Sequence, residues 1–249
     1  MVIAPATFPP LVCSAEPALI PVMTDKPAHR IARFTTRRSS RCAVLGPTDP
    51  EQVRELWVVV HGYGQLATGF VGGLGAIDDG SRLVVAPEGL SRFYDARSSP
   101  GNHAEAPVGA SWMTREDRLH EIADTIDWLQ QACDAFRQLI GRAVPLTVLG
   151  FSQGAAAASR WVASGRVRPV RLICWGASLA PELDLGPDSA LRCTSCVIVT
   201  GATDRYVSAA AVDAERARLD AAAFPYRFVG FDGGHRLDDD TLRQLAAAT

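Results

Sequence analysis

Six strand-like runs, most of them continuously apolar, recur along the chain and predict strands that are buried on both faces. They cover residues 56–60, 83–87, 146–149, 172–175, 197–199 and 226–231. Because such strands cannot leave either face in water, helices must cover both faces of the sheet. Two shorter candidates, residues 31–37 and 42–45, predict an opening hairpin.

The segments between these runs have helical spacing. After Thr114, apolar residues recur at intervals of three and four up to Phe136 and predict one amphipathic helix, with Thr114 and Asp117 as its start. Residues 155–163, 209–222 and 242–248 predict three more helices. Alternating strands and helices indicate an α/β domain with a mostly parallel central sheet.

The domain boundaries follow from composition. Residues 1–25 are rich in proline and predict a flexible leader, and residues 26–249 then form a single domain. Residues 89–112 have no periodicity and many Gly, Pro and Ser residues, which indicates an irregular insertion that acts as a lid or, alternatively, a plain surface connection. Its aromatic residues Phe93, Tyr94 and Trp112 favour a role as a pocket wall.

Composition and charge narrow the function classes. The 249 residues are 47% hydrophobic and 21% charged, which is typical of a globular protein rather than a disordered one. A net charge of −2 gives no general attraction to nucleic acid or to anionic membranes. The chain starts without the basic residues of a signal peptide and contains no apolar stretch of about 20 residues, so we expect a cytoplasmic protein without membrane insertion.

The cysteines do not predict a metal site. Cys193 and Cys196 have CxxC spacing, but no second pair and no histidine pair completes a set of four zinc ligands. Cys196 begins an apolar run, so we interpret it as a small buried side chain. No nucleotide-binding glycine motif is present either, and we expect neither a metal nor an organic cofactor.

The candidate chemistry begins with Gly150-Phe151-Ser152-Gln153-Gly154. This GxSxG pattern follows a predicted strand and precedes an alanine-rich helix, which is the context of a nucleophile elbow. The flanking glycines are needed there because larger side chains would collide with neighbouring backbone. Ser152 is therefore the candidate nucleophile, with an ordinary helix N-cap as the alternative.

A serine nucleophile needs a base and an acid that follow it in the chain. His235 is the only histidine after Ser152 and comes directly after a predicted strand, so it is the candidate base. Asp204, in the loop after the preceding strand, is the candidate acid that would orient the imidazole. Asp213 falls in a predicted helix, and Asp232 remains the main competitor, although it is better explained as a turn residue.

An acyl-transfer site also needs backbone donors for the oxyanion. The N–H of Gln153, at a helix N-terminus, is one candidate. The other is expected from His61-Gly62-Tyr63-Gly64, which follows an early buried strand and matches the oxyanion loop of esterases. His61 precedes the serine, so we expect it to hold this loop in place rather than act as the base.

With these elements in order, the chain resembles the α/β-hydrolase superfamily, and within it the phospholipase/carboxylesterase group that includes the acyl-protein thioesterases. The resemblance rests on WVVVHGYG, VVAPEG, VLGFSQGAA, VTGATDRYV and FDGGH, between residues 57 and 235. It implies Ser152, Asp204 and His235 as the triad and Tyr63, beside Gln153, as an oxyanion donor. Gln65 departs from the pattern because the thioesterases usually have an acidic residue there, and their tryptophan-aromatic-aspartate segment is absent.

The expected function is therefore hydrolysis of a small-molecule carboxylic ester through an acyl-enzyme on Ser152, with Tyr63, Phe93 and Trp112 at the acyl group. A thioesterase or lysophospholipase with the same triad is an alternative within enzymes. A hydrolase-like binding module without activity is the alternative from another class.

Overall fold

The computed structural model describes residues 19–21, 30–95 and 105–248. The chain divides into two compact units, and the boundary lies between Ser39 and Ser40. In the first unit, strand β1 (Leu19–Pro21) pairs antiparallel with β2 (Arg30–Ala32). The rest of the leader that the sequence predicts over residues 1–25 lies outside the described residues.

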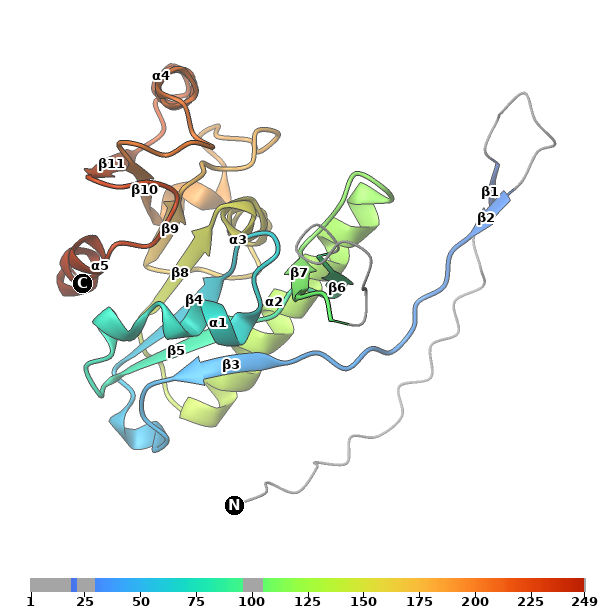
Figure 1. Cartoon of the computed structure of the whole chain (residues 1–249), viewed down its shortest axis with the longest axis horizontal. Coiled ribbons are helices and arrows are strands. Elements are labelled where there is room, and N and C mark those ends of the chain that lie inside the picture. Colours follow the sequence, from blue (N-terminus) through green and yellow to red (C-terminus); the bar gives the residue numbers. More distant parts are fainter. Residues whose placement is uncertain (1–18, 22–29, 96–104, 249) are drawn as a thin grey trace. The chain divides into compact units, whose positions relative to one another are not determined.

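The second unit is built on a seven-stranded sheet (Figure 1). Its strands have the order β11-β10-β9-β8-β4-β5-β3, and every neighbouring pair is parallel except β3 and β5. Their bounds are β3 Cys42–Leu45, β4 Glu55–Val60, β5 Arg82–Pro87, β8 Leu146–Phe151, β9 Arg171–Trp175, β10 Ser195–Gly201 and β11 Tyr226–Phe231. The six predicted runs correspond to six of these strands, and the prediction of a mostly parallel sheet is confirmed. The edge strand β11 is not buried on both faces as predicted, because its positions are half-buried or exposed.

Helices cover both faces of the sheet. Their bounds are α1 Ala67–Gly72, α2 Arg118–Ile140, α3 Gln153–Ala163, α4 Ala209–Ala221 and α5 Asp239–Ala247, with short 3-10 helices at Pro50–Gln52, Gly75–Ile77 and Ala190–Cys193. None of the helices in the described ranges is long and apolar enough to cross a bilayer.

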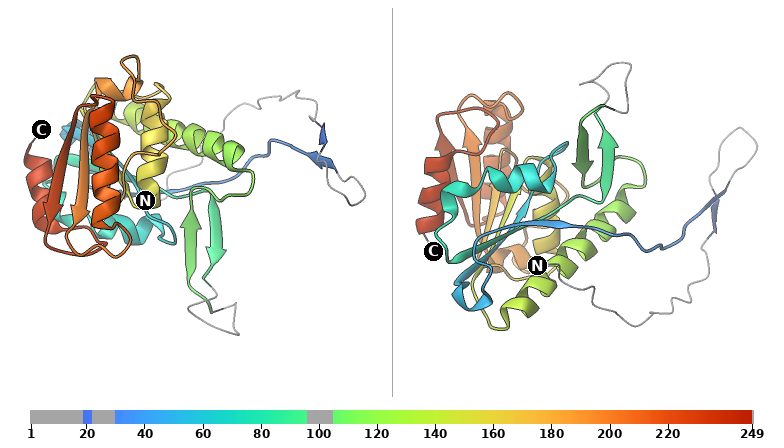
Figure 2. Two further views of the ribbon diagram at one scale, coloured as in Figure 1. Left: turned by 90° about the horizontal axis from the view of Figure 1, so that it is seen from above. Right: turned by 60° about the horizontal axis from the view of Figure 1, so that its bottom comes forward.

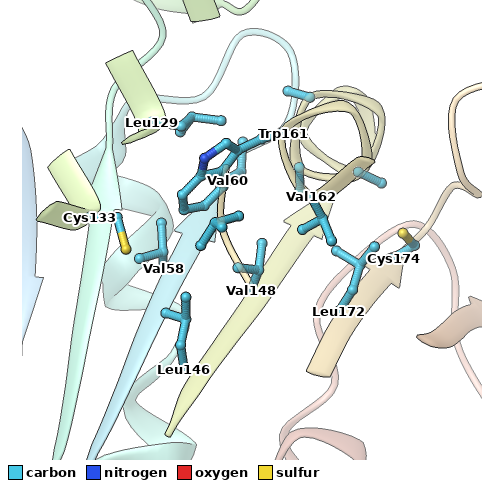
Figure 3. Packing of buried hydrophobic residues seen from close by; sticks show 14 of the residues in the cluster. Val58, Val60, Leu129, Cys133, Leu146, Val148, Trp161, Val162, Leu172 and Cys174 are labelled. Carbon is cyan, nitrogen blue, oxygen red and sulfur yellow. The ribbon is translucent and has the colours of Figure 1, made fainter. Parts of the chain in front are cut away.

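Two apolar cores lie on the two sides of the sheet because its strands send alternate side chains to opposite faces. One core joins the sheet to α2, α3 and α4, and Figure 3 shows Leu129 and Trp161 packed over Val58 and Val148. The other core joins it to α1 and α5 through residues such as Phe70 and Leu242. Cys196 is 3% exposed in the first core, which confirms its interpretation as a small buried side chain.

Two local predictions are wrong. Residues 31–37 and 42–45 do not form a hairpin, because β3 pairs with β5 instead and packs Ala43 and Leu45 against the core beside α1. Helix α2 begins at Arg118 rather than near Thr114. The Thr114 hydroxyl contacts Glu116 and Glu121 and is not a cap, and Asp117 precedes the helix with a φ of 47°.

Residues 89–112 contain more regular structure than their composition predicts. Strands β6 (Ser91–Tyr94) and β7 (Val108–Ser111) pair antiparallel, and Figure 2 shows this pair in green, projecting away from the seven-stranded sheet. Side chains alternate between half-buried and exposed along β6, which is the pattern of a strand with one covered face.

Candidate active site

Ser152 lies at the sharp turn between β8 and α3. Its φ and ψ are 53° and −120°, a strained conformation for a residue with a side chain. The Ser152 side chain makes no capping hydrogen bond to α3, so the N-cap alternative has no support. Its backbone N–H donates to the Trp175 carbonyl at 2.8 Å, which fixes the turn against the end of β9.

The two glycines of the motif are required by close backbone contacts. A Cβ on Gly150 would lie 2.4 Å from the Gly154 carbonyl oxygen. A Cβ on Gly154 would lie 2.1 Å from the Val60 carbonyl oxygen and 2.5 Å from that of His61. The turn can therefore form only with glycine at both positions, as the sequence predicts.

A half-buried His235 and a buried Asp204 form a pair at the ends of the neighbouring strands. His235 Nδ1 lies 2.7 Å from Asp204 Oδ2, and the side chains are 14% and 0% exposed. The other oxygen, Asp204 Oδ1, accepts hydrogen bonds from the N–H groups of Tyr206 and Val207 at 2.8 and 3.2 Å. With Nδ1–H donating to the carboxylate, Nε2 is left as a hydrogen-bond acceptor. The competitor Asp232 is exposed, in the turn before His235.

The His235 ring lies beside the serine turn. The ring of Phe151, the residue before Ser152, has its centroid 4.9 Å from that of His235. A Cβ on Gly176, next to the Trp175 carbonyl that binds Ser152, would lie 2.9 Å from His235 Cε1. The structure therefore brings Ser152, His235 and Asp204 to one edge of the sheet, where β8, β9, β10 and β11 end.

The loop after β4 contains the other candidate backbone donor, the N–H of Tyr63. Gly62 N–H donates to Gln65 Oε1 at 2.8 Å, and Gln65 N–H donates back to the Gly62 carbonyl at 3.2 Å. Gln65 thus closes this turn. Within the described residues, neither Tyr63 N–H nor Gln153 N–H has a hydrogen-bond partner, so both are free to receive an oxyanion.

His61 holds the loop after β4 in place through hydrogen bonds of both its ring nitrogens. It is fully buried, its Nε2 accepts the Gly89 N–H at 2.9 Å, and its Nδ1 therefore carries the proton and donates to the Gly62 carbonyl at 2.8 Å. Burial lowers the pKa of His61 and keeps its ring neutral. Both ring nitrogens are engaged in the loop, as expected for a positioning residue rather than a base.

The Gln153 side chain connects the serine turn to the end of β7. Its Oε1 accepts the Trp112 N–H at 3.2 Å, and its Nε2 donates to the Met113 carbonyl at 2.9 Å. Trp112 is 2% exposed and donates from Nε1 to the His61 carbonyl at 2.7 Å. Trp112, which the sequence predicts at the acyl group, is thus buried against the backbone of the loop after β4.

Two other predicted wall residues do lie together at the surface. The Tyr63 and Phe93 rings stack with centroids 5.1 Å apart, and Tyr63 is 54% exposed. Gly64 N–H donates to the Ala110 carbonyl at 2.9 Å, which binds the oxyanion loop to β7. The strand pair β6–β7 therefore carries Phe93 to the edge of the site.

No sequence pattern indicates the role of Glu88, which stabilises the segment next to His61. This carboxylate is 1% exposed and binds Arg41 at 2.8 Å, Arg92, and the Ala67 N–H at 3.2 Å. Burial opposes its charge, but the hydrogen bonds from both arginines and from Ala67 outweigh this and hold the pKa of Glu88 below its usual value. Glu88 precedes Gly89, so it stabilises the segment that binds His61.

The described part of the chain contains no group of three metal-ligating side chains. The residues at this edge offer a hydroxyl on a strained turn, a hydrogen-bonded His–Asp pair and two backbone N–H groups without a partner among the described residues. This set can support nucleophilic attack on an acyl carbon with stabilisation of the resulting oxyanion.

Comparison with known proteins identifies the fold. No protein-family model and no curated protein sequence matches the chain. Among solved structures it is similar to the Bacillus cereus carboxylesterase (14% identity, 84% of this chain and 92% of that one, TM-score 0.61). It is also similar to a carboxylesterase from Mesorhizobium loti (20% identity, 84% and 95%, TM-score 0.60) and to Zea mays acyl-protein thioesterase 2 (16% identity, 84% and 99%, TM-score 0.58). The chain has the α/β-hydrolase fold, as its motifs predict.

Proposed function

We propose that the protein is a serine carboxylic-ester hydrolase that acts through an acyl-enzyme on Ser152. The observation that carries this proposal is the His235–Asp204 pair at 2.7 Å beside the strained Ser152 turn. The similarity to carboxylesterases adds support at the level of the fold.

In the first half of the reaction, His235 Nε2 removes the proton of Ser152 while Oγ attacks the ester carbonyl. Asp204 holds the imidazole in the required tautomer and stabilises the imidazolium that forms. The N–H groups of Tyr63 and Gln153 stabilise the negative oxygen of the tetrahedral intermediate. His235 then donates its proton to the leaving alcohol as the carbon–oxygen bond breaks.

In the second half, His235 removes a proton from water, and the resulting hydroxide attacks the acyl-enzyme. The same N–H groups stabilise the second tetrahedral intermediate. Collapse of this intermediate returns the proton from His235 to Ser152 Oγ and releases the carboxylic acid. Protein side chains supply every proton transfer in this cycle, and no cofactor is required.

The test is hydrolysis of p-nitrophenyl butyrate by the wild type, Ser152→Ala and a control variant, Ser164→Ala. Ser164 lies at the other end of α3, where its Oγ donates to the Trp161 carbonyl. Removal of Ser152 should reduce kcat by at least about 10³-fold, whereas S164A should retain it. Near-normal turnover by S152A would overturn the proposal.

Thioester hydrolysis with the same triad is the second candidate, which the similarity to the maize thioesterase favours. Matched oxygen esters and thioesters of one acyl chain separate the two by their kcat/KM values. A binding module without activity would give neither turnover nor covalent labelling of Ser152 by a fluorophosphonate.

A further inference from the structure

Tyr206 and Arg205 form an exposed pair beside the general base. The Tyr206 ring meets the His235 ring edge to face at 4.8 Å and is 66% exposed. The Arg205 guanidinium carbon lies 4.9 Å from the centroid of the Tyr206 ring, and Arg205 donates to the Tyr206 hydroxyl at 3.1 Å.

A hydrogen bond to Asp204 fixes the backbone of Tyr206 next to His235. Tyr206 N–H donates at 2.8 Å to Asp204 Oδ1, whose second oxygen binds His235. An exposed tyrosine is normally free to rotate, but here the backbone is tied to Asp204 while His235 and Arg205 contact the ring. These contacts place Tyr206 beside His235, and Arg205 lies over the Tyr206 ring.

Arg205 carries a charge that the fold does not use. It is exposed, and among the described residues no carboxylate forms an ion pair with it. Other arginines around the site are paired, for example Arg41 and Arg92 with Glu88. The planar guanidinium fork binds carboxylate and phosphate groups well, because two of its N–H groups can donate to two oxygens at once.

The proposed reaction determines which part of the substrate lies near the Arg205 guanidinium. His235 must donate its proton to the leaving oxygen, so the leaving group lies next to the imidazole. Tyr206 is in contact with that imidazole, whereas Tyr63 and Phe93 stack on the side of the oxyanion loop.

We infer that Arg205 and Tyr206 select esters whose leaving group carries a negative charge. This inference rests on the proposed ester hydrolysis and adds the class of leaving group to it. The aromatic ring of Tyr206 packs against the leaving group while Arg205 binds its anionic substituent. A cationic leaving group is disfavoured at the same place because of repulsion by the guanidinium.

Three acetate esters with one aromatic ring test the inference: those of 3-hydroxybenzoate, 3-hydroxybenzamide and 3-hydroxyphenyltrimethylammonium. These esters differ in charge at one position. For each ester the kcat/KM of the variant is divided by that of the wild type, so that differences in the intrinsic reactivity of the esters cancel. The variants are Arg205→Gln, which removes the charge, and Arg205→Lys, which keeps it. Phenyl hydrogen succinate and phenyl butyrate form a second pair, with the charge on the acyl side.

We expect R205Q to lower kcat/KM for the carboxylate ester roughly threefold to fivefold, the upper part of the range of an exposed charge pair, and to raise it for the cationic ester. The neutral ester and both acyl-side esters should be unaffected, R205K should keep most of the preference, and salt should weaken it. Equal effects on the three acetates, or a larger effect on the succinate, would overturn the inference and leave ester hydrolysis intact. If the neutral acetate is not hydrolysed in a Ser152-dependent way, the proposed function fails instead.

Discussion

Replacing Gly176 with alanine tests whether the placement of His235 depends on the loop after β9. Gly176 has a φ of 63°, and an added Cβ would lie 2.9 Å from His235 Cε1 and 3.1 Å from Nδ1. Ordinary contact begins near 3.4 Å, so the imidazole must move by about 0.5 Å. That movement stretches its 2.7 Å hydrogen bond to Asp204.

The expected loss in rate follows from this displacement. Misplacement of a reacting group by about 1 Å reduces catalysis by about 10²-fold, so a movement of half that size should lower kcat roughly tenfold. The left-handed backbone adds about 1–2 kcal/mol of lost stability for any residue with a Cβ. A control variant must therefore separate the loss of kcat from the loss of stability.

Gly141→Ala provides the matched control. Gly141 has a φ of 69° at the end of α2, and nothing lies within 4 Å of an added Cβ. Both variants should lose similar free energy of unfolding in urea titrations, but only G176A should lose kcat on p-nitrophenyl butyrate. Equal kcat values for the two variants would refute the conclusion that Gly176 makes room for the general base.

Three other predictions address the acid, the oxyanion loop and the serine turn. Asp204→Asn should lower kcat by about 10³- to 10⁴-fold because the amide no longer fixes the tautomer of His235; a tenfold loss or less in steady-state assays would argue against Asp204 as the acid. The pKa of His61 is lower in the folded protein than its ordinary value of 6.5, so stability is fully present above pH 6.5 and declines as the pH falls toward the folded pKa. His61→Gln should flatten this decline in urea titrations between pH 5 and 7, and an unchanged slope would contradict a buried neutral ring. Gly154→Ala places a Cβ 2.1 Å from the Val60 carbonyl oxygen and should lower the free energy of unfolding by about 3 kcal/mol or more; native-like stability of that variant would contradict the close contact.

The sequence could predict those parts of the fold and site that have local signals. Apolar runs identify strands from their own residues, and the GxSxG turn is recognisable because its glycines are needed within five positions. His235 could be found because it is the only histidine after Ser152. The aromatic content of residues 89–112 predicts Phe93, Tyr94 and Trp112 at a pocket wall, and of these three only Phe93 stacks on Tyr63.

The remaining features depend on contacts between distant residues. The antiparallel pairing of β3 with β5 is decided by burial of Ala43 and Leu45, not by a turn signal. The role of the Gln153 amide depends on Met113, 40 positions earlier, and that of Gly176 depends on His235, 59 positions later. No periodicity or motif within either segment indicates these partners.

The measurement that tests the central claim most directly is capture of the acyl-enzyme. The protein is mixed with excess p-nitrophenyl acetate, quenched in acid within one turnover, digested and examined by mass spectrometry. We expect one acetyl group on the peptide that contains Ser152, and none on that peptide in S152A. Acetylation at another residue, or rapid ester hydrolysis that continues in S152A, would contradict the account.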